Sequence, residues 1–335
     1  MEEINEMIRF ENSIYGEEPD FYLVDFQDWD YFIDRLVNFP KIRPFLLNQI
    51  VAVCKEYCDS KLFRSAFLSK ASVECPVIIH RLYHLGYYSV SDIKNVMDAE
   101  ESILFAYYFY TEIENFSQIT ADYHKSSFFD ELELFNDRIE NLIQYGFLPT
   151  STEYCLKYDD IELLKERMES PLFCQESQGQ WNPFEWSFEP SSFDFLSISG
   201  HFSSLKCFKH LLLNGYKIND NIMSSAVGGG SIEILRMTMN CWQLSPTLII
   251  TALDFCRMEI LEFLIEQIGE SEILSFFESN YTHPLHQSAS RGNIYMVDYI
   301  LSKNADINLS DKDILFFLLN GHLSTMLHGQ IIYTL

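Results

Sequence analysis

The sequence is poor in basic residues and has no long hydrophobic run. Only 23 of its 335 residues are Lys or Arg, against 49 Asp and Glu, which gives a formal net charge of −26. This charge repels phosphate backbones and anionic lipid headgroups, and no stripe of Lys and Arg compensates it. The longest apolar runs, Ile103 to Tyr110 and Ile314 to Leu319, are far too short to cross a bilayer. We therefore expect neither nucleic acid nor a membrane as a partner.

Glycine and proline are also scarce, with 13 and 10 residues, and no Gly-, Pro- or Ser-rich tract occurs. Apolar residues make up 47% of the chain, which excludes a fibrous or disordered protein and is enough for a large core. The first residues, Met1 to Glu6, are acidic where a secretory signal is basic and then apolar. Eight scattered cysteines favour buried free thiols over a disulfide framework. These features predict a soluble cytoplasmic protein.

The balance of charge changes sharply near residue 34. Residues 1–34 hold eleven acidic residues against Arg9 alone, whereas residues 35–70 hold seven bases against two acids. We expect residues 1–34 to form an acidic arm that is either solvated and partly disordered or docked on the following basic stretch.

Short apolar segments at helical spacing follow from about residue 40, and alternating strand patterns are almost absent. Several segments end in Gly after aliphatic residues, as helix C-termini do, at Gly86, Gly146 and Gly215. The sequence therefore predicts an all-α protein. Within it, residues 35–148 are expected to be helical, either as degenerate repeats or as a separate domain.

One segment, Thr282 to Asn308, has the features of a two-helix repeat. It begins Thr-His-Pro-Leu-His, has Gly292 near its middle and ends Ala-Asp-Ile-Asn. Pro284 suits the first turn of a helix, and Gly292 suits a tight turn between two helices. The segment resembles the ankyrin repeat, whose unit begins T-P-L-H-x-A and has a Gly between its helices. Small residues that let the two helices approach each other are Ser288 and Ala289.

Weaker copies of this repeat occur along residues 149–335. Their spacing, measured between the inter-helix turns, averages close to the roughly 33-residue ankyrin period. The resemblance implies an elongated α-solenoid of divergent ankyrin repeats with a degenerate, incomplete last repeat. A helical region followed by divergent repeats also resembles the ankyrin families expanded in protozoan parasites. We place the turns at Asp159-Asp160, Gly200-His201, Gly230-Ser231, Cys256-Arg257, Gly292-Asn293 and Gly321-His322.

Two irregularities interrupt the repeats. An insertion at residues 175–190 carries several aromatic residues, and an insertion in a solenoid projects as a loop on one face. This loop is expected either to fold onto the repeat stack as a lid or to anchor a protein partner. The chain also ends at Leu335 without a polar capping repeat. The end is either a frayed or truncated relic or a surface covered by another chain.

The sequence offers little evidence of catalysis. His80 and His84 lie one helical turn apart, which suits a metal, but Arg81 stands where the zinc-protease motif has Glu, and no third ligand is evident. Cys54 and Cys58 have the same spacing without a Cys/His pair at zinc-finger distance. The Gly-Gly-Gly-Ser run that starts at residue 228 completes no phosphate-binding motif, and G-x-S-x-G is absent. We predict no catalytic residue, no metal site and no cofactor.

The resemblance implies non-catalytic protein binding through the concave face of the solenoid and the inserted loop. An acidic solenoid favours a partner with a basic surface. The alternative is an enzyme or enzyme-complex subunit, with an unrecognised activity in residues 1–148 and repeats that recruit the substrate. Self-association through the C-terminus is a third, structural alternative. The predicted partner contacts are Trp181, Phe184 and Trp186 in the loop, and Asp220, Asn221, Asn280, Tyr281, Asp311 and Lys312 at the hairpin tips.

Overall fold

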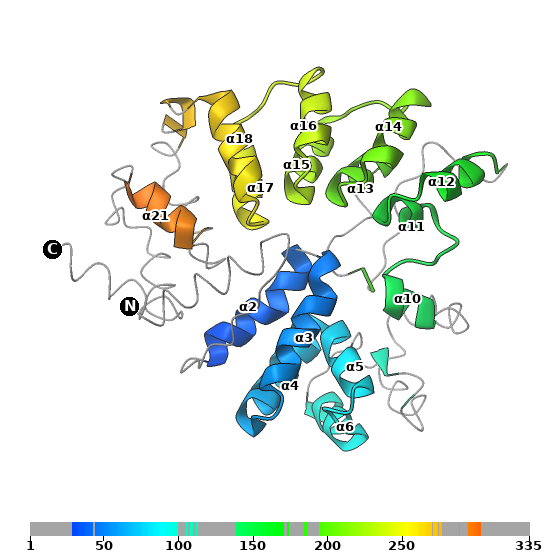
Figure 1. The fold of residues 1–335 in the computed structure, drawn as a ribbon, viewed down its shortest axis with the longest axis vertical. Coiled ribbons are helices and arrows are strands. Elements are labelled where there is room, and N and C mark those ends of the chain that lie inside the picture. Colours follow the sequence, from blue (N-terminus) through cyan, green and yellow to red (C-terminus); the bar gives the residue numbers. More distant parts are fainter. Residues whose placement is uncertain are drawn as a thin grey trace. The chain divides into compact units, whose positions relative to one another are not determined.

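The chain forms two compact helical units, which are considered one at a time below (Figure 1). The N-terminal unit spans Glu2–Pro149 together with Asn182–Phe188, and the repeat unit spans Thr150–Trp181 and Glu189–Leu335. Every secondary-structure element of the described residues is a helix, which confirms the predicted all-α class. The computed structural model describes residues 29–42, 44–99, 105, 108–109, 112, 139–170, 173, 184–185, 194–269, 271–273, 275–276, 288 and 294–302.

The repeat unit is a stack of helical hairpins. The first helices pack in a row, α11 on α13, α13 on α15 and α15 on α17, and the second helices α12, α14 and α16 form a parallel row (Figure 1). The paired helices are α11 (Thr152–Lys157) and α12 (Ile161–Met168), α13 (Phe195–His201) and α14 (Leu205–Leu213), α15 (Asp220–Gly229) and α16 (Ile232–Met239), and α17 (Leu248–Asp254) and α18 (Met258–Ile268), followed by α21 (Ile294–Ser302).

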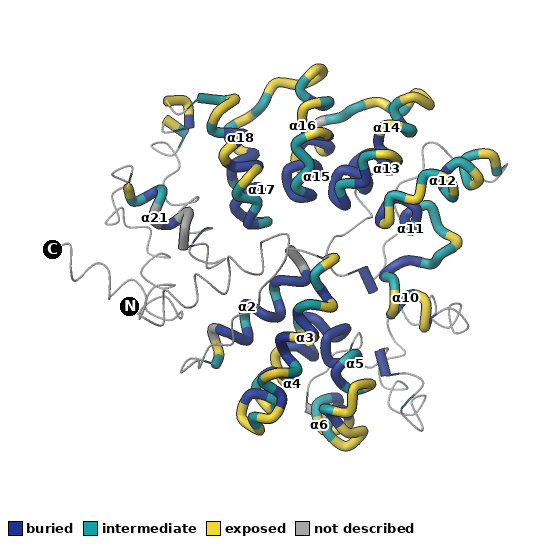
Figure 2. Tube along the Cα trace, in the orientation of Figure 1, coloured by how far each residue is buried: buried dark blue, intermediate teal, exposed yellow. Residues whose placement is uncertain are grey.

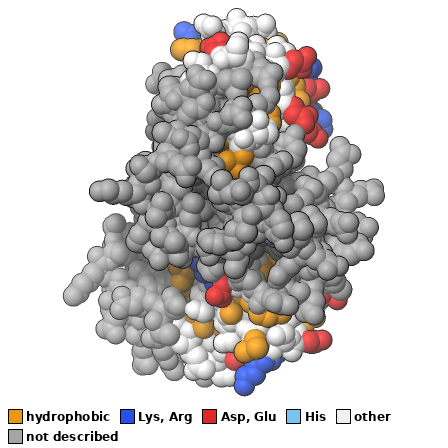
Figure 3. Space-filling view, turned by 90° about the vertical axis from the view of Figure 1, so that its left-hand side faces the viewer, with side chains coloured by type: hydrophobic (Ala, Val, Ile, Leu, Met, Phe, Trp, Pro, Cys, Tyr) orange, Lys and Arg blue, Asp and Glu red, His pale blue; other side chains and the backbone are white. Residues whose placement is uncertain are grey.

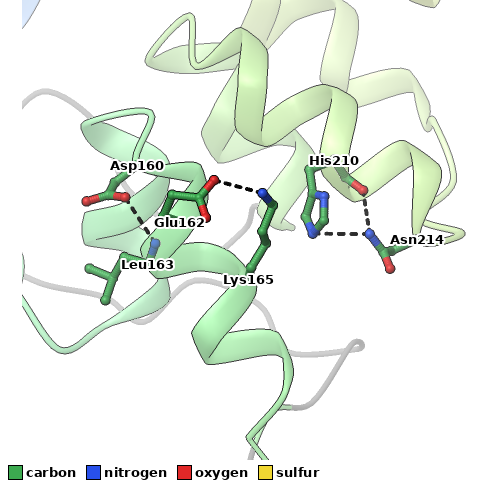
Figure 4. Close-up of polar contacts among 6 residues, drawn as sticks. All are labelled: Asp160, Glu162, Leu163, Lys165, His210 and Asn214. Carbon is green, nitrogen blue, oxygen red and sulfur yellow. Dashed lines mark hydrogen bonds and ion pairs between the residues drawn. The ribbon is translucent and has the colours of Figure 1, made fainter.

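The second helix of each hairpin begins with the same short sequence pattern. At the start of α12 the Leu163 N–H donates to Asp160 Oδ1 (3.0 Å), and at the start of α16 the Ile234 N–H donates to Ser231 Oγ (3.3 Å; Figure 4 shows the first). Such caps satisfy N–H groups that have no partner inside the helix. The fourth residue after each cap is apolar and buried, and these residues are Leu164, Phe208, Leu235 and Leu261.

The turn between the paired helices contains one residue with a positive φ angle. These residues are Asp159, Ser203, Gly230 and Cys256, with φ of 51°, 58°, 87° and 47°. Three of the four lie at turns that the sequence predicted. The turn predicted at Gly200-His201 is wrong, because both residues lie inside α13 and the turn follows at Ser203.

Gly200 has a packing role rather than a turn role, because α13 and α15 approach each other closely there. A Cβ on Gly229 would overlap the carbonyl oxygen of Gly200 and lie 2.7 Å from that of His201. A Cβ on Gly200 would lie 3.4 Å from the Cβ of Ser225, near ordinary van der Waals contact. Only glycine therefore fits at position 229, whereas position 200 has room for a methyl group.

Hydrogen bonds between turns connect successive hairpins. The Asp159 carboxylate accepts from the backbone N–H groups of Lys206 (3.3 Å) and Cys207 (2.9 Å), at the start of α14 in the next hairpin. A carboxylate is stabilised there by the helix dipole. The other such contacts are donated by Ser204 Oγ to the Leu156 carbonyl, by Ser203 Oγ to the Gly229 carbonyl (2.7 Å) and by Arg257 Nε to the Gly228 carbonyl (2.7 Å).

The N-terminal unit repeats this alternating arrangement. Here α2 packs on α4, α3 on α5 and α4 on α6, while α2 pairs with α3 and α4 with α5. Gly86 and Gly146 end α5 and α10 with positive φ, as the sequence predicted. The elements are α2 (Trp29–Ile42), η1 (Pro44–Leu46), α3 (Leu47–Tyr57), α4 (Lys61–Glu74), α5 (Pro76–His84), α6 (Val90–Ala99) and α10 (Ile139–Tyr145).

The predicted acidic arm is too long at its end, because α2 already begins at Trp29. Phe32 and Ile33 are buried in the core of the N-terminal unit. Asp34 pairs with Lys70 (Oδ1 to Nζ 2.9 Å), which joins the acidic stretch to the basic one at one point. Both side chains are partly exposed, so this pair contributes little stability. Residues 1–28 lie outside the described residues.

All seven residues of α13 are buried, including His201. The His201 ring contacts the rings of Phe202 (centroids 5.0 Å apart) and Phe255 (5.8 Å). Burial, together with the positive charges of Arg257 and Lys157, lowers the pKa of His201 to about 3. This histidine is therefore neutral in the folded protein at every pH near neutrality.

We expect Gly229→Ala to lower the free energy of unfolding of the repeat unit by about 3 kcal/mol or more, because the new methyl group meets backbone atoms that cannot move aside. Gly200→Ala is the matched control on the facing helix and should change it by no more than about 1 kcal/mol. Urea unfolding followed by circular dichroism measures both variants. Equal effects of the two substitutions would contradict this packing.

We expect His201 to make stability depend on pH. The unfolded chain binds a proton on this residue near its ordinary pKa of about 6.5, whereas the folded chain does so only near 3. Its contribution is therefore fully present above about pH 6.5 and falls below it, by up to about 1.4 kcal/mol per pH unit. Urea unfolding between pH 7.5 and 5 should show a shallower slope in His201→Phe than in wild type. The control His210→Gln should keep the wild-type slope; equal slopes in all three would refute this role.

Candidate functional site

Two loops connect the second helix of one hairpin to the first helix of the next. Residues 214–219 join α14 to α15, and residues 240–247 join α16 to α17. Together with Leu213 they are called the tip surface here, defined as residues 213–219 and 240–247. The Trp242 Nε1–H donates to the Ile218 carbonyl (3.4 Å), so neighbouring loops contact each other.

A chain of hydrogen bonds organises the base of the first loop. Asp194, the N-cap of α13, accepts from the Ser197 N–H (2.7 Å) with one oxygen and from the Asn219 amide (2.5 Å) with the other. The Asn219 side-chain oxygen in turn accepts from the Asn221 N–H (3.0 Å) at the start of α15. The loop is thus held to the first turns of two successive helices, which limits its movement.

The tip surface exposes apolar side chains and carries little charge. Leu213 is 86% exposed and Trp242 is 45% exposed. Lys217 is the only charged residue in the two segments, although the net charge of the chain is −26. Exposed Trp and Leu side chains in segments with so little charge are typical of a contact surface.

Three of the second helices, α12, α16 and α18, in contrast, expose acidic residues, whereas the exposed charged residues of α14 are Lys206 and Lys209. Figure 2 shows the exposed stretches of these helices. Most of the charged side chains that colour the upper part of Figure 3 are likewise acidic. On α12 the ion pair of Lys165 Nζ with Glu162 Oε1 (2.8 Å) offsets part of this charge (Figure 4). At the end of α14, the Asn214 side-chain amide donates to the His210 carbonyl (2.8 Å) and lies 3.3 Å from His210 Nε2 (Figure 4). The exposed acidic residues of α12, α16 and α18 are Glu162, Glu166, Glu233, Glu259, Glu262 and Glu266.

The first helices of the hairpins have few exposed side chains. In addition to the fully buried α13, none of the seven residues of α17 is exposed, and among the residues of α15 whose burial is described only Asn221 and Ser224 are exposed. The predicted contact residues Asp220 and Asn221 form the first turn of α15 and therefore lie beside the tip loop rather than in it. The accessible surface of the described hairpins thus consists mainly of the tips and the second helices.

Of the inserted loop, residues 175–190, the structure describes Phe184 and Glu185. Phe184 is buried, and its ring contacts that of Tyr108 edge to face, with centroids 5.3 Å apart. It belongs to the interior of the N-terminal unit and is not an exposed partner contact. The other predicted contacts, Trp181, Trp186, Asn280, Tyr281, Asp311 and Lys312, lie outside the described residues, as does the C-terminal segment after residue 302.

Sequence reasoning missed Leu213 and Trp242. A usable signal was present, because Trp242 lies in an uncharged, Pro-containing stretch at the same place in its hairpin as Asn214-Gly215 in the previous one.

The sequence analysis considered two groups of residues for reactivity or metal binding, the cysteines and the pair His80 and His84. The described cysteines are free, and burial raises the pKa of Cys58 to about 12 and that of Cys155 to about 11, so these thiols are unreactive. The histidine pair has a third neighbour that the sequence did not reveal. Ligand atoms of His80, His84 and Glu112 all lie within 4.8 Å of one another.

Comparisons with known proteins bear on the repeats. The family model of the ankyrin repeat matches residues 280–312, which contain the segment that the sequence identified and the helix α21 with buried Val297 and Ile300. Neither the curated proteins nor the solved structures gave a match to this chain. Among the described helices, none has the length and apolar character needed to span a membrane. The chain thus contains one ankyrin repeat, at residues 280–312, and a stack of helical hairpins precedes it in the repeat unit.

Proposed function

We propose that this protein is a non-catalytic binding module that holds a partner protein on its tip surface. Ankyrin repeats are typically protein-interaction domains without catalysis. The observation that carries the proposal is Trp242, which is half exposed yet held against the neighbouring loop by its indole N–H. Such a side chain is already ordered, so a partner can cover it at a small entropic cost.

The distribution of charge supports the tips as the centre of the interface. Interface centres are depleted in charged residues and enriched in Trp, whereas rims are polar. The tip surface with Leu213 and Trp242 is poor in charge, as interface centres are, and the helices α12, α16 and α18, with their exposed glutamates, have the polar character of a rim. The partner should therefore present an apolar patch surrounded by Lys and Arg. The acidic rim would mainly raise the association rate.

The proposal shifts the contact away from the concave face that the resemblance implied. Burial of α13 leaves few side chains there, whereas Asn221 at the start of α15 remains exposed beside the tips. We retain Asn221 and Asp220 as edge contacts, together with Asn280, Tyr281, Asp311 and Lys312 at later tips.

We expect a photo-crosslinking residue placed at Leu213 or Trp242 to capture the same discrete protein from a lysate of cells that express this chain. Placed at Glu262, an exposed position on α18, it should capture that protein much less. With the captured partner purified, Trp242→Ala should weaken affinity about 30-fold, as loss of a central interface Trp does. Capture from Glu262 alone, or unchanged affinity of Trp242→Ala, would contradict the proposed surface.

A separate prediction concerns the inserted loop, residues 175–190, and its contribution to partner binding. We expect the double substitution Trp181→Ser with Trp186→Ser to weaken binding of the same partner, because Trp is enriched among the residues that dominate binding energy and loops commonly carry such residues. Titration calorimetry with the purified partner measures the change, and circular dichroism checks that the variant is folded. Unchanged affinity in a folded double variant would restrict the interface to the hairpin tips.

The enzyme alternative has one observation in its favour, which is the cluster of His80, His84 and Glu112 in the N-terminal unit. Two imidazoles and a carboxylate form a ligand set that occurs in catalytic zinc sites. This cluster is independent of the tip surface and is treated separately below.

A further inference from the structure

The end of helix α5 presents two histidines on one face. His80 and His84 are four residues apart, so their side chains lie one above the other. Their Nε2 atoms are 3.0 Å apart, and the ring planes meet at 74° with centroids at 4.4 Å. Both rings therefore direct the same nitrogen to one point.

Glu112 reaches this point from a later part of the N-terminal unit. It closes a turn in which its backbone N–H donates to the Phe109 carbonyl (3.1 Å). Its Oε1 atom lies 3.3 Å from His84 Nε2 and 3.7 Å from His80 Nε2. Two nitrogens and one oxygen thus form a small triangle with edges of 3.0, 3.3 and 3.7 Å.

Aromatic side chains fix the positions of these ligands. The His80 ring contacts those of Phe109 (5.5 Å between centroids) and Tyr108 (5.9 Å), and both of these residues are buried. The Tyr83 ring contacts those of His84 (5.4 Å) and Phe109 (5.4 Å). Ordered ligand side chains lower the cost of assembling a site. The apolar rings also strengthen charge interactions at the triangle by lowering the local dielectric.

Hydrogen bonds from neutral imidazoles do not account for the triangle well. Each neutral ring carries one N–H, so at least one of the three contacts brings two lone pairs or two N–H groups together. A metal cation among the three atoms accepts a lone pair from each of them. In a tetrahedral zinc site with bonds of about 2.0–2.1 Å, ligand atoms lie about 3.3 Å apart, which agrees with the observed edges.

We propose that His80, His84 and Glu112 bind one Zn²⁺ ion. Two imidazole nitrogens and one carboxylate oxygen suit zinc, whereas Mg²⁺ and Ca²⁺ prefer sites made of oxygen alone. The His80 side chain is 14% exposed and that of Glu112 16%, but His84 is 52% exposed. The fourth position therefore opens to solvent on the His84 side and takes a water molecule. The ion connects the end of α5 to the turn at Phe109–Glu112.

The test is a zinc titration of the intact, reduced protein after removal of metals with a chelator, with a chromogenic chelator as competitor. We expect one Zn²⁺ per chain. His80→Gln and Glu112→Gln should each raise the dissociation constant by at least about 100-fold, since loss of even an outer-shell partner costs about 10- to 100-fold. The control His210→Gln, with a histidine one helical turn from Asn214 on another helix, should bind zinc as wild type does.

Two further measurements keep the result interpretable. Glu112→His restores a zinc ligand at the same position, so it should bind zinc far more tightly than Glu112→Gln does if the proposal holds. Co²⁺ in place of Zn²⁺ reports on the ligands, because thiolate ligation produces strong near-ultraviolet charge-transfer bands that nitrogen and oxygen ligands lack. Failure to bind zinc, binding unchanged in both Gln variants, or thiolate bands from the cysteines would each overturn the proposal. None of these results depends on the partner protein.

Discussion

The close approach of α13 and α15 sets the geometry of the repeat unit. A single two-helix hairpin cannot bury its own apolar side, so each hairpin depends on its neighbour. Where Gly229 meets the carbonyl oxygen of Gly200, the two backbones touch with no side chain between them. This contact fixes the distance between successive hairpins. Hydrogen bonds between turns, such as that from Ser203 to Gly229, then fix their register.

Local sequence patterns predicted most of the repeat unit, because they depend on neighbouring residues only. The turns at Asp159, Gly230 and Cys256 were all recognisable. Gly200 was misplaced because glycine serves both tight turns and close packing, and sequence alone does not separate the two uses. The run Ser204-Leu-Lys-Cys-Phe resembles the first residues of the other second helices. It therefore marks where α14 begins and places the turn just before it, at Ser203.

Features that depend on distant contacts were not predictable in the same way. Phe184 lies in the inserted loop, yet it packs with Tyr108, far away in the sequence. Glu112 joins the histidine pair only because a turn at Phe109 positions it. The N-terminal unit also shows the alternating helix contacts of the repeats without a repeat motif. Packing there is set by buried aliphatic and aromatic residues, which many sequences supply.

The two units offer different chemistry. In the repeat unit, the helices α12, α16 and α18 expose glutamates and the tip surface holds Lys217 as its one charged residue, an arrangement that suits a protein surface with a basic rim. In the N-terminal unit, nitrogen and oxygen ligands converge among aromatic rings.

Hydrogen–deuterium exchange of the intact chain, free and bound to its captured partner, tests most directly whether binding occurs at the tips. We expect exchange to slow in residues 213–221 and 240–247 and to stay unchanged in α12, α16 and α18; slowing confined to those three helices or to the N-terminal unit would contradict it.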